Sequence, residues 1–357
     1  MSTQPGVSII VNCYNYDRFI EAAIDSALAQ DHRPLQVIVV DDGSTDGSWA
    51  LIQGYGACIE ARRQDNQGQG AACLHGLSLA RHEIVVFLDA DDILEPHAAR
   101  TIVEAWGDGV SKVQYCLAVI DEHGVPDGNV FPKFGKGLSP EAARAEIFRT
   151  GSYPDSPTSG NAYARDFAAA VLPLVAHHDS FDGELNGLAP LYGDVISLDR
   201  PLARYRIHGS NKYAQGALAV ERFSAYLRSV EHRTAFLREH YRSKGQTIGQ
   251  DVLDHDLKYL EYALVVEKLD RKEGPGRRGV WSVAALAIRA ALRSPYSPMH
   301  KAVRIAWLCA LAAAPRGLSS FLVEQRFIPA RRIALLTWLA TWRQRPRPPL
   351  DGSVSVL

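Results

Sequence analysis

Residues 83–92 read EIVVFLDADD, an apolar run that ends in a cluster of acidic residues. Two earlier segments have the same form, Val7–Cys13 (VSIIVNC) and Gln36–Val40 (QVIVV), and polar residues close each of them. Short runs rich in β-branched residues are typical of strands that a parallel sheet buries on both faces. The sequence therefore predicts a sheet with these three segments near its centre.

Apolar residues recur at helical spacing between the predicted strands, from Phe19 to Leu28 and more weakly from Ala71 to Ala80. Such spacing indicates helices with one apolar face. Alternating strands and helices predict an α/β fold with a doubly wound, mostly parallel sheet. Ala57–Ala61 is a weaker candidate for a further strand.

Polar clusters follow all three strands. Asn12, Tyr14 and Asn15 close the first strand, Asp42 follows the second, and Asp89–Asp92 follow the third. In open α/β sheets, ligands bind outside the carboxyl ends of the strands. We therefore expect the three clusters to line one crevice.

The cluster Asp89-Ala90-Asp91 has the spacing of a cation site. An extended backbone sends alternate side chains to the same side, and carboxylate oxygens are the ligands that Mg²⁺ and Mn²⁺ prefer. The alternative is an Asp-rich turn without a ligand. Asp42 and Tyr14 together suggest a nucleoside pocket, although Asp42 also begins a good turn sequence.

These segments, in their order and spacing, resemble family 2 glycosyltransferases of the GT-A fold. The later segments PTSGNAYARD and APLYGDVISLDRPLARYRIHGSN resemble further blocks of that family, so the likeness covers roughly residues 7–211. The resemblance implies an inverting, metal-dependent hexosyltransferase that moves a sugar from a UDP-, dTDP- or GDP-sugar to a hydroxyl. The expected acceptor is a glycan or a lipid-linked glycan, in the synthesis of cell-surface polysaccharide.

The resemblance also implies roles for particular residues. It assigns nucleotide-sugar binding to Asn12, Tyr14, Asn15, Asp42, Asp89 and Ala90. It assigns Mn²⁺ or Mg²⁺ binding to Asp89, Asp91 and His208, with Asp92 secondary. A histidine at position 208 could complete the metal shell or hydrogen-bond a phosphate, but lone histidines are more often structural.

The catalytic base that the family uses is a carboxylate before the APLYG block, and Asp182 matches it best in the segment HHDSFDGELNGLAPLYG. A Glu-Asp pair that is common in relatives is absent here. Asp179 and Glu184 therefore stay open as alternatives.

The pattern loosens after the third strand. A strand is expected at 113–120 and a helix at 140–149, on either side of a Gly- and Pro-rich stretch at 124–137. Helical spacing returns at 219–242 and 252–268.

We expect three domains from this pattern. They are a GT-A catalytic domain at 1–215, a helical extension at 216–270, and a basic, Trp-rich helical tail at 271–357. The fold is thus an α/β domain followed by a C-terminal α-helical region.

The tail carries the chain's charge asymmetry. The whole chain has a net charge of −1, yet residues 271–357 hold 15 Lys and Arg against 3 Asp and Glu, and four of six tryptophans. Apolar runs at 305–314 and 333–342 are too short to span a bilayer. We expect the tail to lie on an anionic membrane surface, or else to form a helical accessory domain.

Composition and motifs exclude other classes. Five scattered cysteines without a C-x-x-C pair, and no visible secretory signal, indicate a cytoplasmic protein, peripheral on the inner face of the membrane if the tail binds there. The basic residues are interleaved with apolar runs, so no nucleic-acid partner is expected. A dinucleotide-dependent oxidoreductase is disfavoured because Cys73 stands at the third glycine position after Gly68 and Gly70. A non-catalytic sugar-nucleotide-binding or scaffold protein on the same fold stays as the alternative.

Overall fold

The structure is a computed structural model that describes residues 4–134, 138–178, 181–209, 220–270, 278–294 and 296–327. Contacts between residues divide the chain into two compact units. The first takes in residues 1–215 and 229–253, and the second takes in residues 216–228 and 254–357. The domain boundaries expected after residues 215 and 270 stay predictions.

The segments expected to be strands form the parallel half of the sheet. Its strands are β1 (Val7–Cys13), β2 (Leu35–Asp41), β3 (Glu60–Arg63) and β4 (Ile84–Asp89), in the spatial order β3-β2-β1-β4. All three pairings are parallel. The carboxyl ends of β1, β2 and β4 therefore meet at one edge, as the sequence predicts. The weaker candidate at 57–61 is displaced, because Gly56–Cys58 forms a 3₁₀ turn and β3 begins only at Glu60.

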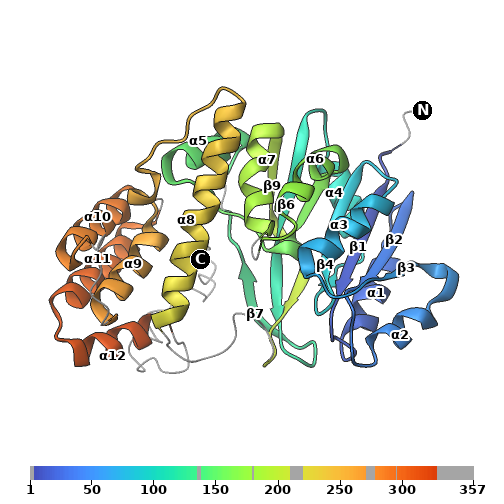
Figure 1. Cartoon of the computed structure of the whole chain (residues 1–357), viewed down its shortest axis with the longest axis horizontal. Helices are drawn as coiled ribbons and strands as arrows, with labels where there is room; N and C mark the ends of the chain where they lie inside the picture. The colour runs from blue at the N-terminus through green and yellow to red at the C-terminus, as the bar shows by residue number, and fades with distance from the viewer. Residues whose placement is uncertain are drawn as a thin grey trace, which may run out of the picture. The chain divides into compact units, whose positions relative to one another are not determined.

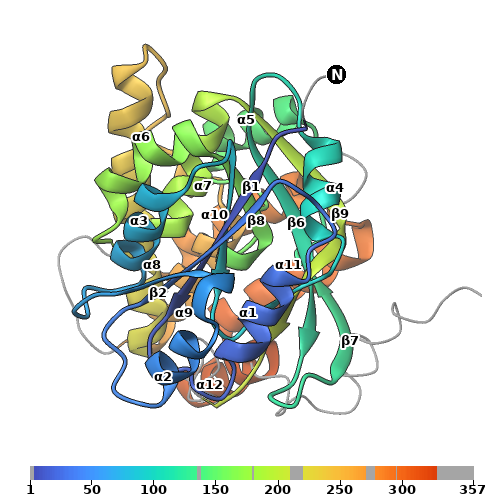
Figure 2. The ribbon, with the colours of Figure 1, turned by 90° about the vertical axis from the view of Figure 1, so that its right-hand side faces the viewer.

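Beyond β4 the sheet is mixed. The further strands are β5 (Ile93–Leu94), β6 (Val110–Ile120), β7 (Pro126–Phe131), β8 (Asn161–Ala164) and β9 (Asp194–Arg206). Strand β8 runs antiparallel to both β4 and β6, whereas β9 runs parallel to β6. Figure 2 shows β6 beside β7, its antiparallel partner. Strand β7 lies in the Gly- and Pro-rich stretch, whose composition gave no strand signal.

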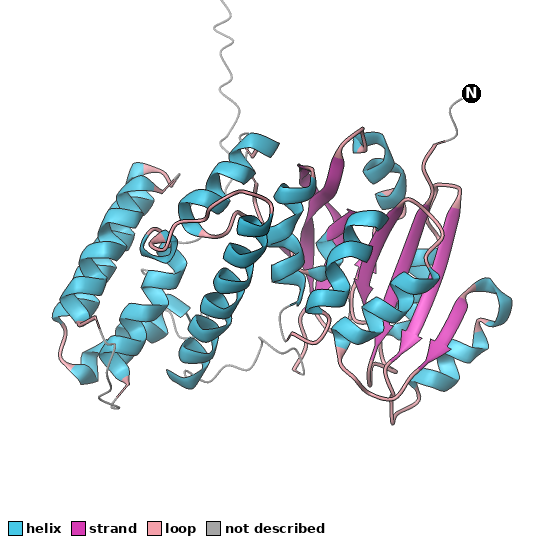
Figure 3. Cartoon of the chain, turned by 45° about the horizontal axis from the view of Figure 1, so that its top comes forward, coloured by secondary structure: helices cyan, strands magenta, loops and turns pink. Residues whose placement is uncertain are grey.

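Helices cover both faces of the sheet in the first unit (Figures 1 and 3). One face is covered by α1 (Ile20–Leu28), α2 (Ser48–Gly54) and α4 (Ala98–Ala105). The other is covered by α3 (Gln69–Leu79), α5 (Pro140–Thr150), α6 (Arg165–Val175), α7 (Phe181–Tyr192) and residues 229–243 of α8 (Val220–Ser243). Strand residues alternate between the two cores: Ile9 packs with α1, whereas Ile10 packs with α3. Each such fully buried side chain contributes about 1.5–3 kcal/mol.

The second unit is helical. Its helices are α9 (Leu257–Leu269), α10 (Val280–Arg293), α11 (Pro298–Ala313) and α12 (Arg316–Phe327), with residues 220–228 of α8. Leu264, Ala287 and Leu308 lie in their common core. The buried carboxylate of Glu261 accepts hydrogen bonds from Arg304 and Arg326, each at 3.1 Å.

The basic tail is described only in part. Helix α11 contains most of the apolar run at 305–314, and it buries Leu308 and Leu311 in the helical core. The second apolar run, at 333–342, lies outside the described residues. Among the helices that the structure describes, none combines the length and the apolar character needed to cross a bilayer.

Candidate active site

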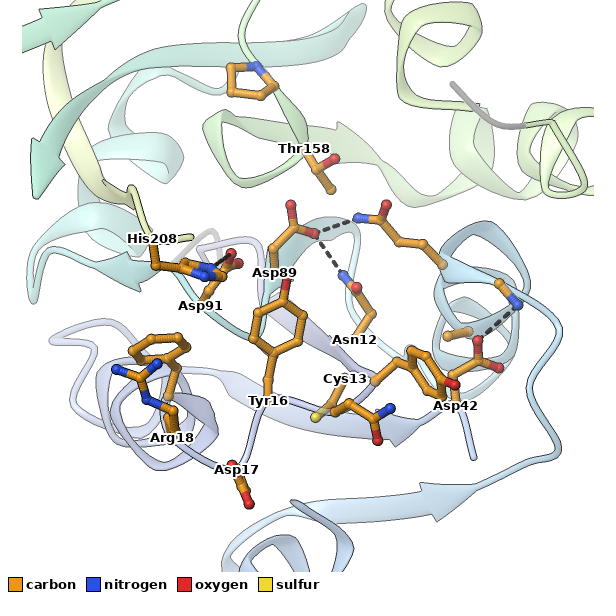
Figure 4. Close-up of a pocket in the computed structure, with 18 of the residues that line it drawn as sticks. Asn12, Cys13, Tyr16, Asp17, Arg18, Asp42, Asp89, Asp91, Thr158 and His208 are labelled. Atoms are coloured by element: carbon orange, nitrogen blue, oxygen red, sulfur yellow. Dashed lines mark hydrogen bonds and ion pairs between the residues drawn. The ribbon is translucent and has the colours of Figure 1, made fainter. Parts of the chain in front are cut away.

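A cavity of about 690 Å³ opens at the carboxyl ends of β1, β2 and β4 (Figure 4). Its lining includes Asn12, Tyr14, Asn15, Asp42, Asp89, Ala90, Asp91, Asp182 and His208. Asp92, the secondary metal candidate, and the two alternative bases are not among the described lining residues. The prediction of a single crevice is therefore confirmed. The separate role of each residue stays a prediction.

Asp89 sits at the end of β4, where neighbouring side chains fix its carboxylate. Its Oδ1 accepts hydrogen bonds from Asn12 Nδ2 at 3.0 Å and from Gln69 Nε2 at 2.6 Å. Its backbone N–H donates to Ser159 Oγ at 3.1 Å. Burial, and then the neighbouring Asp91 carboxylate, raise the pKa of Asp89 to about 7. A cation bound at this carboxylate would favour its ionised form and so lower its pKa again.

Asp89, Asp91 and Asp92 form what we call the acidic cluster, in which one oxygen of each carboxylate lies within 4.8 Å of the others. Burial, followed by Asp91, raises the pKa of Asp92 well above its usual range. Asp92 Oδ1 accepts from the backbone N–H of Arg206 at 3.0 Å, while its buried Oδ2 has no hydrogen-bond partner among the described residues. The guanidinium of Arg206 acts electrostatically on Asp92 and Asp91, so a positive charge already lies beside the three carboxylates.

His208 lies against this cluster. Its Nε2 is 3.0 Å from Asp91 Oδ2, and its ring packs against both Tyr16 and Phe19, with centroids 5.8 and 4.9 Å away. Figure 4 shows His208 and Asp91 facing each other at one side of the cavity. The aromatic packing fixes the imidazole in the direction of the carboxylate.

The charge of the lining tests whether the residues fit a metal ion. The cavity's described lining includes five carboxylates and one guanidinium: Asp17, Asp42, Asp89, Asp91, Asp182 and Arg18. An anionic ligand would be repelled by such a lining unless a cation entered with it. All-oxygen ligands in close array suit a hard divalent ion. The residues therefore fit Mg²⁺ or Mn²⁺.

Asp42 lies at the other side of the cavity and holds a loop. Its Oδ1 accepts from Gln64 Nε2 at 2.8 Å and from the Gln67 N–H at 2.9 Å, and its Oδ2 accepts from the Gly68 N–H at 2.8 Å. Oδ2 keeps the capacity to accept from one further donor. The next residue, Gly43, has φ +75°, and a Cβ there would come within 2.8 Å of the Asn66 nitrogen, so the loop approaches too closely for any other residue.

Asn15 and Tyr14 follow β1 at the same side. Asn15 has φ +60°, and its Oδ1 accepts from the Thr45 N–H at 2.8 Å. This side chain thus joins the turn after β1 to the turn after β2. Tyr14 is 44% exposed, which leaves its ring accessible from the cavity.

Asp182 stands in the first turn of α7 and lines the cavity. Its Oδ1 accepts from the Gly183 N–H at 2.9 Å. Burial, and then Asp155, raise the pKa of its carboxyl. Of the two alternative bases, Glu184 is not among the described lining residues, and Asp179 lies outside the described residues. Burial raises the pKa of Glu184 to about 7, although the nearby Arg233 acts to lower it.

Sequence reasoning missed several lining residues. Tyr16 and Gln69 contact the acidic cluster or its histidine, and Thr158 and Tyr205 come from the mixed half of the sheet and its connections. Gln69 had one usable signal in the sequence, the glycine before it; in the structure Gly68 has φ +92° and precedes α3. Thr158 and Tyr205 lie in the two later segments that resemble blocks of the family, but nothing in those segments singled them out, because strand pairing brings them to the cavity.

Comparison with known proteins decides the family. The sequence profile described as "Glycosyl transferase family 2" matches residues 8–152. An uncharacterized glycosyltransferase of Nostoc sp. is 35% identical over 221 residues, which cover 60% of this chain and 68% of that protein. The chain belongs to glycosyltransferase family 2. A chondroitin synthase of Escherichia coli is 34% identical over 110 residues, although these make up only 16% of that longer protein.

A solved structure supports the fold of this family 2 glycosyltransferase. TarS 1–349 of S. aureus, in complex with UDP, superposes with a TM-score of 0.50 at 16% identity, covering 97% of this chain and 94% of that one. The α/β fold of the GT-A type, followed by a helical region, is therefore confirmed. In the glycosyltransferase the glycines at 68 and 70 open α3 after the loop that Asp42 holds, which gives them a structural reason other than dinucleotide binding.

Proposed function

We propose that this glycosyltransferase is an inverting, metal-dependent enzyme that transfers a sugar from a nucleoside-diphosphate sugar to a hydroxyl of a glycan or lipid-linked acceptor. The product would enter cell-surface polysaccharide. The observation that carries the proposal is that a single cavity is lined by Asp42, by two carboxylates of the acidic cluster and by Asp182. A donor bound along this cavity would contact a nucleoside-binding part, a cation-binding part and a general base. We call the first two the nucleoside end and the cation end.

The nucleoside end is formed by Asp42, Tyr14 and the loop at 64–68. Asp42 Oδ2 would accept a hydrogen bond from a base N–H, while the exposed ring of Tyr14 packs against the base. The backbone and side-chain hydrogen bonds that Asp42 accepts from the loop hold this carboxylate in place before the donor arrives. Because the structural neighbour TarS was solved with UDP, UDP is the first nucleotide to test, ahead of dTDP and GDP.

The cation end is formed by Asp91 and Asp89, with His208 either as a further ligand or as the group that orients Asp91. A bound Mg²⁺ or Mn²⁺ supplies charge stabilisation to the departing diphosphate. Asn12 and Gln69 hold Asp89, and His208 contacts Asp91, so both carboxylates are fixed by neighbours. Fixed ligands need little reorganisation during the reaction.

Asp182 is the proposed general base. Its carboxylate would accept the proton of the acceptor hydroxyl as that oxygen forms a bond to C1 of the sugar, while the bond from C1 to the diphosphate breaks on the opposite face. A raised pKa makes the carboxylate a stronger base once it is ionised. One base suffices, since inversion needs no covalent intermediate with the enzyme.

We also propose that the second unit, which contains the basic tail, binds an anionic membrane surface. This would bring the enzyme to a glycan or lipid-linked acceptor. Helices α10 and α11 expose Trp281 (68%), Leu292 (57%) and Val303 (54%), and Arg289 and Arg293 are exposed on α10. Tryptophan with basic residues suits a headgroup interface. The accessory-domain alternative is favoured by Leu308, which packs inside the helical core instead.

Vesicle sedimentation separates the two hypotheses for the second unit. The full chain should sediment with anionic vesicles at low salt and lose that binding at high salt, because near-surface basic residues contribute about 1 kcal/mol each. Equal binding to neutral and anionic vesicles, or none to either, would leave the accessory-domain hypothesis.

The test of the function uses the full chain with UDP, dTDP and GDP in thermal shift, with and without Mn²⁺. A nucleotide at 100 times its dissociation constant should stabilise the fold by about 2.7 kcal/mol. The matching nucleotide sugar should then release nucleoside diphosphate only with Mn²⁺ or Mg²⁺. Binding without release, over a panel of donors and with both metals, would leave the non-catalytic alternative.

A further inference from the structure

A second group of side chains that could hold a metal ion lies among the helices of the first unit. His178 follows α6, Glu184 is in the first turn of α7, and His232 is on α8. Each offers one ligand atom, and these atoms lie within 4.8 Å of one another. None of the three is among the described residues that line the donor cavity. We call them the histidine cluster.

The distances within the histidine cluster are already near those of a metal site. Glu184 Oε1 is 3.1 Å from His178 Nδ1 and 3.8 Å from His232 Nδ1. Ligands about 2.0–2.2 Å from a tetrahedral zinc ion lie about 3.4 Å from each other. Binding would therefore need only side-chain adjustment.

The burial of Glu184 points independently to a missing partner. Its side chain is 1% exposed, and Oε2 has no hydrogen-bond partner among the described residues. Both histidines contact Oε1, so a cation would also satisfy Oε2 only if it bound both oxygens of the carboxylate. A buried carboxylate oxygen without a partner is costly, so such a group usually meets a cation, a donor or a proton.

We propose that His178, Glu184 and His232 form a second divalent-cation site, of the zinc type. Two imidazole nitrogens and one carboxylate oxygen are a donor set that suits Zn²⁺ and leaves its fourth position to water. The all-carboxylate acidic cluster suits harder ions instead. The two clusters should therefore prefer different metal ions.

One nearby cation competes with a metal at this site. Arg233 follows His232 on α8, and a Cβ placed on Gly183 would come within 2.8 Å of its Nη1. The guanidinium also acts to lower the pKa of Glu184. Replacement of Arg233 by Met should therefore strengthen zinc binding, because it removes a like charge.

A cation here would tie three helices together. Glu184 stands two residues after Asp182 in the first turn of α7, so the site would fix that turn to α8 and to the end of α6. This positioning effect rests on the proposed function of Asp182. Zinc binding itself does not depend on it.

The experiment is a titration of the full chain with Zn²⁺, and with Co²⁺ as a spectroscopic probe, in excess Mg²⁺ to occupy the acidic cluster. We compare the wild type with His232→Gln, His178→Gln and Glu184→Gln. His232 is 64% exposed, so its replacement should leave the fold intact. The matched control is His240→Gln, which lies two turns further along α8 and bonds only to Phe236 O among the described residues.

The wild type and His240→Gln should each bind one equivalent of Zn²⁺ and give the visible absorption of tetrahedral Co²⁺. His232→Gln should bind zinc at least about tenfold more weakly and lose the cobalt bands. Arg233→Met should bind it more tightly. Equal zinc affinity in the wild type and His232→Gln, or no binding by the wild type, would overturn the proposal. Neither outcome bears on Mn²⁺-dependent sugar transfer, so the two proposals fail separately.

Discussion

The acidic cluster and the histidine cluster are built in opposite ways. The acidic cluster comes from four consecutive positions at the end of one buried strand, Asp89–Asp92, and it offers only oxygen ligands. The histidine cluster joins three helices, and its members stand 6 and 48 residues apart in the sequence. A strand end can place ligands by local spacing, whereas helices can do so only by packing. A site of the first kind can therefore be recognised in the sequence, and a site of the second kind cannot.

The largest expected effect is at the acidic cluster. Asp91→Asn should abolish metal-dependent transfer and leave the fold intact, because it removes a ligand charge but hardly any volume. A lost ligand acts on stabilisation of the leaving group, worth several kcal/mol in metal-assisted chemistry. The measurement is turnover against Mn²⁺ concentration.

Asp166→Asn serves as the control for that change, since its side chain is 93% exposed and lies outside the described lining. Near-normal turnover of Asp91→Asn in saturating Mn²⁺ would refute the metal assignment. Zinc binding at the histidine cluster should be unchanged in both variants, which sharpens the distinction between the two clusters.

Asp182→Asn should lower turnover by about 10² to 10⁴ while donor affinity stays nearly unchanged, as expected for a positioned general base. Donor affinity is measured by titration with the nucleotide sugar, and turnover by release of nucleoside diphosphate. If Asp179→Asn or Glu184→Gln instead gives the large loss with donor affinity preserved, the base is at that position. A base at Glu184 would place a catalytic residue within the histidine cluster.

The effect of Glu184→Gln on the free energy of unfolding should depend on whether zinc is present. In EDTA the variant should be at least as stable as the wild type, because an amide costs less to bury than a carboxylate with an unsatisfied oxygen. With Zn²⁺ at 100 times its dissociation constant, the wild type should gain about 2.7 kcal/mol and the variant little. Urea unfolding in both conditions measures this. A variant that is less stable by the same amount with and without zinc would contradict the site.

The last prediction concerns a buried lysine that belongs to neither cluster. Lys112 is fully buried, with Nζ 2.6 Å from Asn186 Oδ1, and burial lowers its pKa to about 7. Between pH 7 and about 10.5, the unfolded chain therefore binds a proton that the folded chain does not. Stability should rise with pH across this window, by at most about 1.4 kcal/mol per pH unit.

Lys112→Met should flatten that slope, as measured by urea unfolding at several pH values between 7.5 and 9.5. The exposed Lys133→Met is the control and should keep the slope of the wild type. An unchanged slope in Lys112→Met would mean that the ammonium group stays charged in the folded chain.

The parallel half of the fold could be predicted from the sequence because its signals are local. β1, β2 and β4 are apolar runs bounded by polar residues, and parallel pairing needs only that pattern with helices between. Strand β8 has only four residues, and β7 lies in a stretch rich in glycine and proline. Their places come from pairing with β4 and β6, which no local pattern encodes.

The position of the cavity could be predicted from the sequence alone, since Asn12, Asp42 and Asp89–Asp91 lie at or just after the carboxyl ends of strands that had to meet at the same edge. The sequence did not show that Asp42 also holds the loop at 64–68 or that His208 faces Asp91, which depend on the folded chain. The histidine cluster likewise forms only through the packing of helices. Neighbours along a strand share a surface because of their spacing, whereas residues far apart in the chain meet only where packed elements place them.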